Sequence, residues 1–300
     1  MDRFVSLKIF VAVGEEQSFA AAARRLALSP PAVTRAVSAL EHTLGVKLLQ
    51  RSTRIVRLTE IGARYLLDCK RILSDLEEAD QLASGAQAEV RGSLAITASV
   101  LFGRAFVAPL LHAFLKRYDK INLRALLVDR VVDLIEEGLD VAVRIAHLSD
   151  ASFTAIRVGA VRNVVCASPA FLKRHGLPKT PDDLKQLPTF CFSSDRSPPA
   201  WSFQMGKRTV AVRPSARLVV NSPEIAMQGA VAGEGITRVL SYQAASELKA
   251  GRLRVILREF EPEPLPIHVI HREGRRAAAR VRAFVDFAVS ELRSNPLLKS

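Results

Sequence analysis

Cysteine, aromatic residues and long uncharged apolar segments are all scarce in this chain. Three of its 300 residues are cysteine, and such an odd, sparse set is typical of a reducing compartment rather than of a disulfide scaffold. No apolar run reaches about 18 uncharged residues, so no segment is predicted to span a membrane. An acid, Asp2, stands at the second position and is followed by an amphipathic helix, unlike a signal peptide. These absences predict a cytoplasmic protein.

Motifs of the common enzyme classes are missing as well. The sequence has no G-x-S-x-G, no G-x-x-x-x-G-K-[ST] and no H-E-x-x-H. His268 and His271 are three residues apart on a predicted strand, so they point to opposite faces and cannot chelate one metal ion together. Cys166 and Cys191 lack a neighbouring base, and we interpret them as buried thiols, with a redox pair as the alternative. We therefore expect no enzymatic activity, no cofactor and no metal.

The net charge of +13 is unevenly distributed. Residues 1–90 carry a net charge of +1, whereas residues 91–300 carry +12. Within the first part, residues 24–57 hold seven basic side chains against one acid, Glu41. A local basic cluster of this kind is a plausible footprint for phosphates. The downstream excess favours a small anionic ligand, although a generally basic surface is an equally good explanation.

Two helices joined by a short turn are predicted over residues 18–26 and 30–44. Ser29 is a suitable N-cap for the second helix, and Pro30 occupies the first helical position, where its missing N–H has no cost. Gly45 ends this helix. The pair has the pattern of a helix-turn-helix, in which the second helix enters the major groove of DNA.

The second helix has two different faces. Its apolar side chains recur at helical spacing and should pack inward; they are Val33, Val37, Leu40 and Leu44. The opposite face is small, polar or cationic, as a major groove would accept. Residues 46–49 and 55–58 follow as a predicted hairpin, or wing, with cations at its tip. The residues expected to contact DNA are Ser29, Pro30, Pro31, Thr34, Arg35 and Ser38 of the helix, and Arg51, Thr53, Arg54 and Arg57 of the wing.

The spacing of these residues resembles a known family. The relevant positions are Phe10, Ser18-Phe19-x-Ala21-Ala22-Ala23-x-x-Leu26, Ser29-Pro30-x-Ala32-Val33-Thr34-Arg35, Leu40-Glu41-x-x-Leu44-Gly45-x-x-Leu48, Arg51 and Leu58-Thr59-x-x-Gly62. Together they resemble the winged helix-turn-helix of the LysR-type transcriptional regulators over about sixty residues. Many members carry Gln where this chain has Pro30, and proline cannot read a base by hydrogen bonding. We therefore predict a DNA-binding domain over residues 1–59.

Residues 60–90 are predicted to form a linker that is mostly one long helix. A heptad seam is formed by Tyr65, Cys69, Ile72, Leu76, Ala79 and Ala83. At 1.5 Å per residue the helix would be roughly 40 Å long. The family resemblance implies that this helix pairs with that of a second subunit, giving a homodimer or homotetramer. The alternative is that the seam packs against the chain's own second domain.

From residue 91 to residue 300, strands and helices alternate. This order predicts a doubly wound parallel sheet. One of the predicted helices is short and covers residues 132–137. Two α/β subdomains are expected, one over about 91–162 plus 268–300 and the other over about 163–267. They resemble the periplasmic-binding-protein-like effector domain of the same family, most clearly over residues 129–144. The predicted fold class is thus multi-domain α/β, with a winged helix-turn-helix, a linker helix and a two-subdomain effector domain.

Ligands of such sheets bind beyond the carboxyl ends of the strands, where the two halves meet. Arg144 could instead be a structural partner of nearby acids. The residues that this rule selects are Ser99, Val100, Leu101, Val128, Asp129, Arg144, Ile145, Phe192, Ser193, Asn221 and Gly235.

These patterns predict a sequence-specific DNA-binding transcriptional regulator modulated by a small-molecule effector, possibly an anion. The expected partners are double-stranded promoter DNA with an interrupted inverted repeat, the effector, further copies of the chain and RNA polymerase, with no membrane. The alternative is a solute-binding protein of the periplasmic-binding-protein fold whose N-terminal part serves only for interaction. That alternative requires export and leaves residues 18–57 unexplained.

Overall fold

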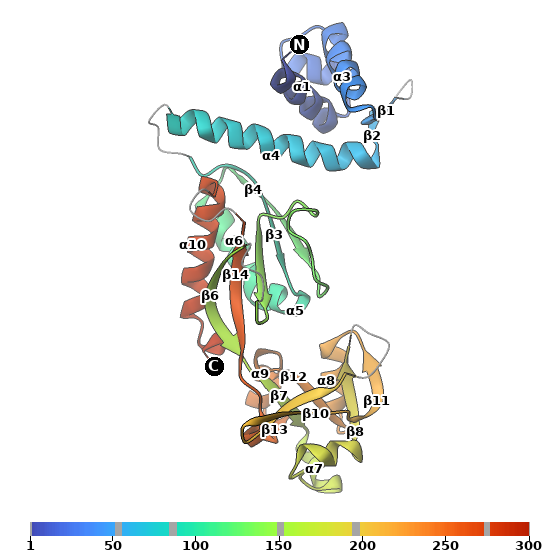
Figure 1. The fold of residues 1–300 in the computed structure, drawn as a ribbon, viewed down its shortest axis with the longest axis vertical. Coiled ribbons are helices and arrows are strands. Elements are labelled where there is room, and N and C mark those ends of the chain that lie inside the picture. The colour runs from blue at the N-terminus through green and yellow to red at the C-terminus, as the bar shows by residue number, and fades with distance from the viewer. Residues whose placement is uncertain are drawn as a thin grey trace.

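The computed structural model describes residues 2–51, 56–83, 89–148, 153–193, 199–272 and 277–299. In Figure 1 the N-terminal helices lie at one end of the molecule, the long helix α4 (Glu60–Ala83) crosses beside them, and two α/β subdomains follow. Among the described helices, none combines the length and apolar character needed to cross a membrane. The order of elements confirms the predicted multi-domain α/β architecture.

The N-terminal unit consists of three helices and a two-stranded wing. Ser18 and Ser29 cap two of the helices, because their hydroxyl oxygens accept the backbone N–H three residues later at 3.2 Å and 3.4 Å. Gly45 ends α3 with φ +70°, a left-handed conformation open to glycine without steric cost. The elements are α1 (Arg3–Glu16), α2 (Phe19–Arg25), α3 (Pro30–Leu44), β1 (Leu49–Arg51) and β2 (Val56–Leu58), with the two strands antiparallel.

One apolar core joins these elements to the start of α4. Val33, Val37 and Leu40 are buried as predicted, together with Phe10 of α1 and Leu48 before the wing. Leu44, the fourth residue of the predicted stripe, packs at the edge of the same core.

Helix α4 approaches the wing very closely at its first turn. Thr59 caps the helix by accepting the Gly62 N–H at 2.9 Å, and its hydroxyl donates to the Lys47 carbonyl at 2.8 Å. A Cβ on Gly62 would lie 1.9 Å from the Leu48 carbonyl oxygen, so only glycine fits this position. As a result, one face of α4 packs into the N-terminal core.

The first two residues of the predicted dimerisation seam are consequently used inside the chain. Cys69 is fully buried and Tyr65 packs on the same core, with its ring 5.7 Å from that of Phe10. The expectation that Tyr65 and Cys69 face a second subunit is therefore wrong, because the N-terminal unit covers them. Further along α4, Ile72 and Ala79 are exposed and Leu76 is half-buried, whereas the side chain of Ala83 lies outside the described ones.

The first subdomain is a five-stranded sheet of order β4-β3-β5-β14-β6. Strand β3 pairs in parallel with β4 and β5, as predicted, whereas β14 and β6 run antiparallel. Its strands are β3 (Gly92–Ala98), β4 (Ile121–Leu127), β5 (Val141–Ile145), β6 (Thr154–Val161) and β14 (Leu265–His271). Its helical segments are α5 (Val100–Phe102), the π-helical η1 (Gly103–Val107), α6 (Ala108–Arg117), α10 (Ala279–Ser294) and the 3₁₀ turn η5 (Pro296–Leu298).

The second subdomain is a five-stranded sheet of order β11-β8-β12-β7-β13 with a separate hairpin, β9-β10. Its strands are β7 (Asn163–Ala167), β8 (Pro188–Phe192), β9 (Trp201–Met205), β10 (Arg208–Val212), β11 (Ser215–Val220), β12 (Ile236–Leu240) and β13 (Arg254–Ile256). Its helices are α7 (Pro169–His175), α8 (Pro223–Val231) and α9 (Ser241–Lys249), with 3₁₀ turns η2 (Pro181–Lys185) and η3 (Arg258–Phe260). Two extended segments, leading into β7 and β14, connect the subdomains (Figure 1).

The predicted element pattern needs correction in a few places. Residues 132–137 form turns rather than a helix, although Gly138 closes them with φ +60°. Strand β6, the β9-β10 hairpin and helix α9 had not been predicted. Strand β14 joins the first sheet from Leu265 onward, so the chain returns to that subdomain a few residues before position 268.

One buried arginine fastens the effector domain to α4. Arg280 of α10 is 4% exposed and donates to the Ser93 carbonyl at 3.0 Å, to the Ser74 hydroxyl at 3.2 Å and to the Asp75 carboxylate at 3.0 Å. Ser74 and Asp75 belong to α4, and Ser93 is the second residue of β3. The guanidinium therefore bridges the long helix and the first sheet.

Candidate functional site

The N-terminal unit presents the predicted DNA-contacting face of α3 to solvent. Pro31, Arg35 and Ser38 are exposed on successive turns, and Thr34 is half-buried beside them. Ser29 and Pro30 are exposed at the amino end of the helix. An exposed helix face with small side chains around one arginine fits the width and chemistry of a major groove.

A buried carboxylate ties the wing to this helix. Glu41, on the inner face of α3, accepts the backbone N–H groups of Leu48 and Leu49 at 2.9 Å and 3.1 Å and pairs with Lys47 at 2.9 Å. Burial by itself would raise the pKa of Glu41, but the hydrogen bonds from Lys47, Leu49 and Leu48 outweigh it and hold the pKa below its ordinary value. Glu41 thereby fixes where the wing starts relative to α3.

The predicted wing contacts are described only in part. Arg57 is exposed on β2. Arg51 is the last residue of β1, and the side chain of Arg51 is not among those that the structure describes. Thr53 and Arg54 lie outside the described residues. Among the described residues, no carboxylate pairs with Arg24, Arg35 or Arg57, which leaves these cations available to phosphates.

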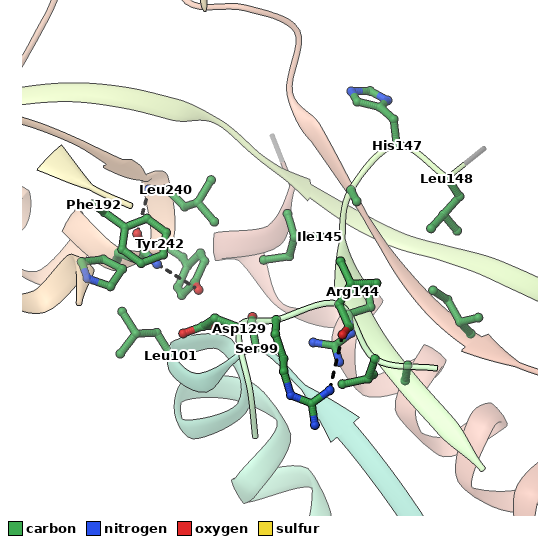
Figure 2. Close-up of a pocket in the computed structure, with 18 of the residues that line it drawn as sticks. Ser99, Leu101, Asp129, Arg144, Ile145, His147, Leu148, Phe192, Leu240 and Tyr242 are labelled. Atoms are coloured by element: carbon green, nitrogen blue, oxygen red, sulfur yellow. Dashed lines mark hydrogen bonds between the residues drawn. The ribbon is translucent and has the colours of Figure 1, made fainter. Parts of the chain in front are cut away.

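The second site is a cleft of about 600 Å³ between the two α/β subdomains. Figure 2 shows Phe192, Leu240 and Tyr242 of the second subdomain on one side and Asp129, Arg144 and Ile145 of the first on the other. The described lining residues come from eight segments, and most of these lie at or just after the carboxyl end of a strand. The predicted residues that line it are Ser99, Leu101, Asp129, Arg144, Ile145 and Phe192.

Arg144 is held by neutral groups rather than by the acids near it. Its guanidinium donates to the Val128 carbonyl at 3.0 Å and to the Thr97 hydroxyl at 2.9 Å. Burial lowers the pKa of Arg144, and the negative charges of Asp129 and Glu137 partly offset that effect. A guanidinium has five N–H groups, so some of them remain for a ligand.

Other charges of the cleft region are already paired. Asp129 accepts the Val100 N–H at 3.0 Å, so a carboxylate of the protein already occupies the amino end of α5. Arg130 forms a two-point contact with Glu137 at 2.6 Å and 2.8 Å. At the edge of the cleft, Arg104 pairs with Glu224 of the other subdomain at 3.2 Å.

Aromatic contacts across the cleft come from a segment that the strand rule had missed. The ring of Tyr242 in α9 packs edge-on against Phe102 at 5.6 Å and against Phe106 at 5.4 Å. Gln243 also lines the cleft. Burial raises the pKa of Tyr242 to about 12, so its hydroxyl stays protonated. The signal was present in the sequence, because Leu240 ends β12 and Tyr242 follows it.

The remaining predicted residues surround the cleft without lining it. Val100 and Val128 support it through the backbone contacts given above, Ser193 donates its N–H to the Val220 carbonyl, and Asn221 is exposed before α8. Gly235 was wrong, because it precedes β12 and lies against Pro188 at the opposite end of the parallel strands. The rule holds at the other end of the same strand, where Leu240 lines the cleft.

The three thiols are all buried. Burial raises the pKa of Cys69 to about 11 and that of Cys166 to about 12, and it also raises the pKa of Cys191. A protonated buried thiol is a poor nucleophile. Within the described residues, no cluster of three or more His, Cys, Asp or Glu side chains is arranged to hold a metal ion.

Two family models match the two parts of the chain. The profile described as "Bacterial regulatory helix-turn-helix protein, lysR family" matches residues 4–63, and the "LysR substrate binding domain" profile matches residues 87–293. The chain belongs to the LysR family of transcriptional regulators, with a helix-turn-helix DNA-binding domain and an effector-binding domain. The match at the amino end excludes the alternative in which that region serves only for interaction.

Relatives and solved structures cover nearly the whole chain. An HTH-type transcriptional repressor of Pseudomonas aeruginosa (strain UCBPP-PA14) is 32% identical over 99% of this chain and 94% of its own length. The transcriptional activator AaeR of Escherichia coli (strain K12) is 31% identical over 95% and 93%. The structure of CrgA, a LysR-type regulator from Neisseria meningitidis, is 30% identical with a TM-score of 0.60 and covers 96% of this chain and 98% of its own.

Proposed function

We propose that this protein binds promoter DNA through α3 and the wing, as a homodimer or homotetramer, and that a small molecule in the cleft adjusts its geometry. The observation that carries the DNA part is the exposed face of α3, to which Glu41 fixes the wing. Two recognition helices related by a two-fold axis would read an interrupted inverted repeat. RNA polymerase is the further partner that such a regulator requires, and the cytoplasm is the compartment that holds both.

Arg35 provides the direct test of the DNA interface. Arg35 is exposed at the centre of the α3 face and has no carboxylate partner among the described residues, so it should contact a base edge or a phosphate. Arg35→Ala should therefore weaken binding to a specific promoter fragment by about 1–3 kcal/mol. The measurement is a gel-shift titration at fixed salt. Arg117→Ala, an exposed cation on the distant α6, is the matched control. Wild-type affinity of Arg35→Ala would remove α3 as the recognition helix.

We propose that the outer half of α4 forms the dimer contact. Ile72 is 40% exposed, and Leu76 and Ala79 continue the same stripe away from the N-terminal core. Such exposed apolar side chains on a long helix are explained by burial against a second copy. Ile72→Glu should shift the sedimentation coefficient toward the monomer, whereas Asp80→Glu on the same helix should not. A dimer that survives Ile72→Glu together with Leu76→Glu would place the contact elsewhere.

We infer that the effector works by changing how the two subdomains meet. The cleft walls come from both subdomains, and the Tyr242 ring lies between them. A ligand that prefers one relative orientation shifts the population toward it, and Arg280 links that movement to α4. The names of the relatives include both a repressor and an activator, so the sign of regulation has to be measured on the promoter itself. We infer no catalytic activity.

A further inference from the structure

The effector cleft continues into a side pocket of about 220 Å³ inside the second subdomain. Phe192, Leu240 and Gln243 line both spaces, so the two adjoin. Beyond them the side pocket is walled by Trp201 and Arg238, among others. A ligand in the cleft can therefore extend one end into the side pocket, next to the Arg238 guanidinium.

Arg238 has few partners for a guanidinium in this position. It is partly buried, donates to the Ser202 carbonyl at 3.3 Å and lies 5.7 Å from the centre of the Trp201 ring. Within the described part of the chain, no carboxylate lies within ion-pair distance of it, and the side pocket has no acidic lining residue. Most of its N–H groups therefore have no acceptor among the described residues.

Two other arginines removed from solvent each have a carboxylate partner. Arg162 pairs with Glu261 at 2.7 Å, and Arg280 has a carboxylate, a hydroxyl and a carbonyl as acceptors. A guanidinium that is withdrawn from water without a counter-charge is costly. Burial lowers the pKa of Arg238 to about 10, which still leaves the group charged at neutral pH. Among the described residues, the positive charge of the side pocket thus has no carboxylate partner.

We propose that the side pocket is an anion subsite of the effector cleft, in which Arg238 binds the carboxylate of an effector whose apolar body contacts Phe192 and Leu240. This inference rests on the proposed function of the cleft. A carboxylate matches a guanidinium at two points, whereas a phosphate needs more donors than these apolar walls supply. The other cations of the cleft are less available, since Arg130 is paired with Glu137 and Arg144 is held by Val128 and Thr97.

The first test uses matched pairs of carboxylates and amides on the full chain. Benzoate, phenylacetate, 3-phenylpropionate and hexanoate are each compared with the corresponding primary amide by thermal shift and calorimetric titration at constant ionic strength. At least one carboxylate should raise the melting temperature while its amide does not. Arg238→Gln should weaken its binding about tenfold or more, and Arg174→Gln, which removes a distant guanidinium of the same subdomain, should not.

Three outcomes would overturn the subsite. They are that none of the carboxylates binds, that amides bind as well as carboxylates, or that Arg144→Gln abolishes binding while Arg238→Gln retains it. Gel shifts with the promoter fragment run on the same samples separate this inference from the proposed function. Promoter binding without a carboxylate effect would contradict only the subsite, whereas loss of promoter binding by the wild-type chain would contradict the regulator itself.

A second test needs no ligand. If Arg238 lacks a counter-charge, Arg238→Met should keep or raise the melting temperature of the free protein, by up to about 2–4 °C. Arg280→Met, which removes a guanidinium with three acceptors, should lower it. A clear loss of stability in Arg238→Met would show that Arg238 is a structural residue and would overturn the proposal.

Discussion

In the N-terminal unit, the side chains proposed to contact DNA lie on successive turns of one helix and on the adjoining wing. In the effector cleft, the described lining residues come from eight separated segments of two subdomains. The first surface keeps its shape because local bonds such as those of Glu41 hold it. The second keeps its shape only while two domains stay packed. A substitution in the N-terminal unit should therefore perturb only its surroundings, whereas one in the cleft should perturb both subdomains.

The largest effect is expected where the two subdomains meet. Tyr242 is buried against Phe102 and Phe106, so Tyr242→Ala should lower the free energy of unfolding by about 3–5 kcal/mol. Chemical denaturation of the full chain is the measurement. Tyr242→Phe keeps the ring and loses only a 3.3 Å contact from Gln243, so it should be nearly neutral. Equal losses in both variants would mean that the hydroxyl, not the packing, joins the subdomains.

A somewhat smaller loss is expected at the junction of the wing and α4. Gly62→Ala places a Cβ 1.9 Å from the Leu48 carbonyl oxygen, so it should destabilise the protein by about 3 kcal/mol although alanine favours helices. Ala63→Ser on the exposed side of the same turn is the control. Promoter affinity should fall along with stability. A stable Gly62→Ala protein with unchanged promoter binding would show that this junction is not as tightly defined as the structure has it.

The contribution of Glu41 to the stability of the N-terminal unit depends on pH. Glu41→Gln should cost about 1–3 kcal/mol at neutral pH, because a buried, charge-assisted acceptor of two N–H groups is lost. The pKa of Glu41 is lowered on folding, so its contribution is complete above the pKa of the unfolded chain and disappears as the pH falls through the folded-state value.

Urea unfolding at neutral and at acidic pH measures this effect. The difference between wild type and Glu41→Gln should shrink on acidification. Glu60→Gln, which breaks an exposed ion pair with Arg64, should be close to wild type throughout. A Glu41→Gln defect that does not change with pH would assign the effect to shape rather than to charge.

The smallest effect is expected from an exposed ion pair across the mouth of the cleft. Arg104 and Glu224 are 3.2 Å apart, but their side chains are 63% and 44% exposed. A double-mutant cycle with Arg104→Ala and Glu224→Ala should give a coupling energy below about 1 kcal/mol. A larger coupling would identify this pair as a latch between the subdomains and would weaken the assignment of that role to Tyr242.

Most of the N-terminal unit could be predicted because its signals are local. Ser29, Pro30 and Gly45 act on their own helix, and the apolar stripe of α3 repeats at helical spacing. The predicted dimerisation seam of α4 was wrong at Tyr65 and Cys69. Periodicity identifies an apolar face of a helix but not the partner that covers it. Residues 132–137 had helical composition, yet they form no helix, and the Asp133 side chain accepts the N–H groups of Ile135 and Glu136.

The lining of the cleft was predictable only where it follows the carboxyl end of a predicted strand. Ser99, Asp129 and Phe192 follow predicted strands and line it, whereas Tyr242 belongs to an unpredicted helix. Gly235 was selected because it borders a strand, and strand direction placed it at the wrong end.

The sequence by itself determined the winged helix-turn-helix, the long helix and the two-part α/β domain, because caps, glycines and apolar periodicity act over a few neighbouring residues. Only the tertiary structure decided which face of α4 is covered, which segments meet at the cleft and which groups surround each arginine. Those properties depend on which distant groups come within a few ångströms of one another. Arg238 and Arg280 are the same residue type in the sequence, and only their surroundings distinguish them.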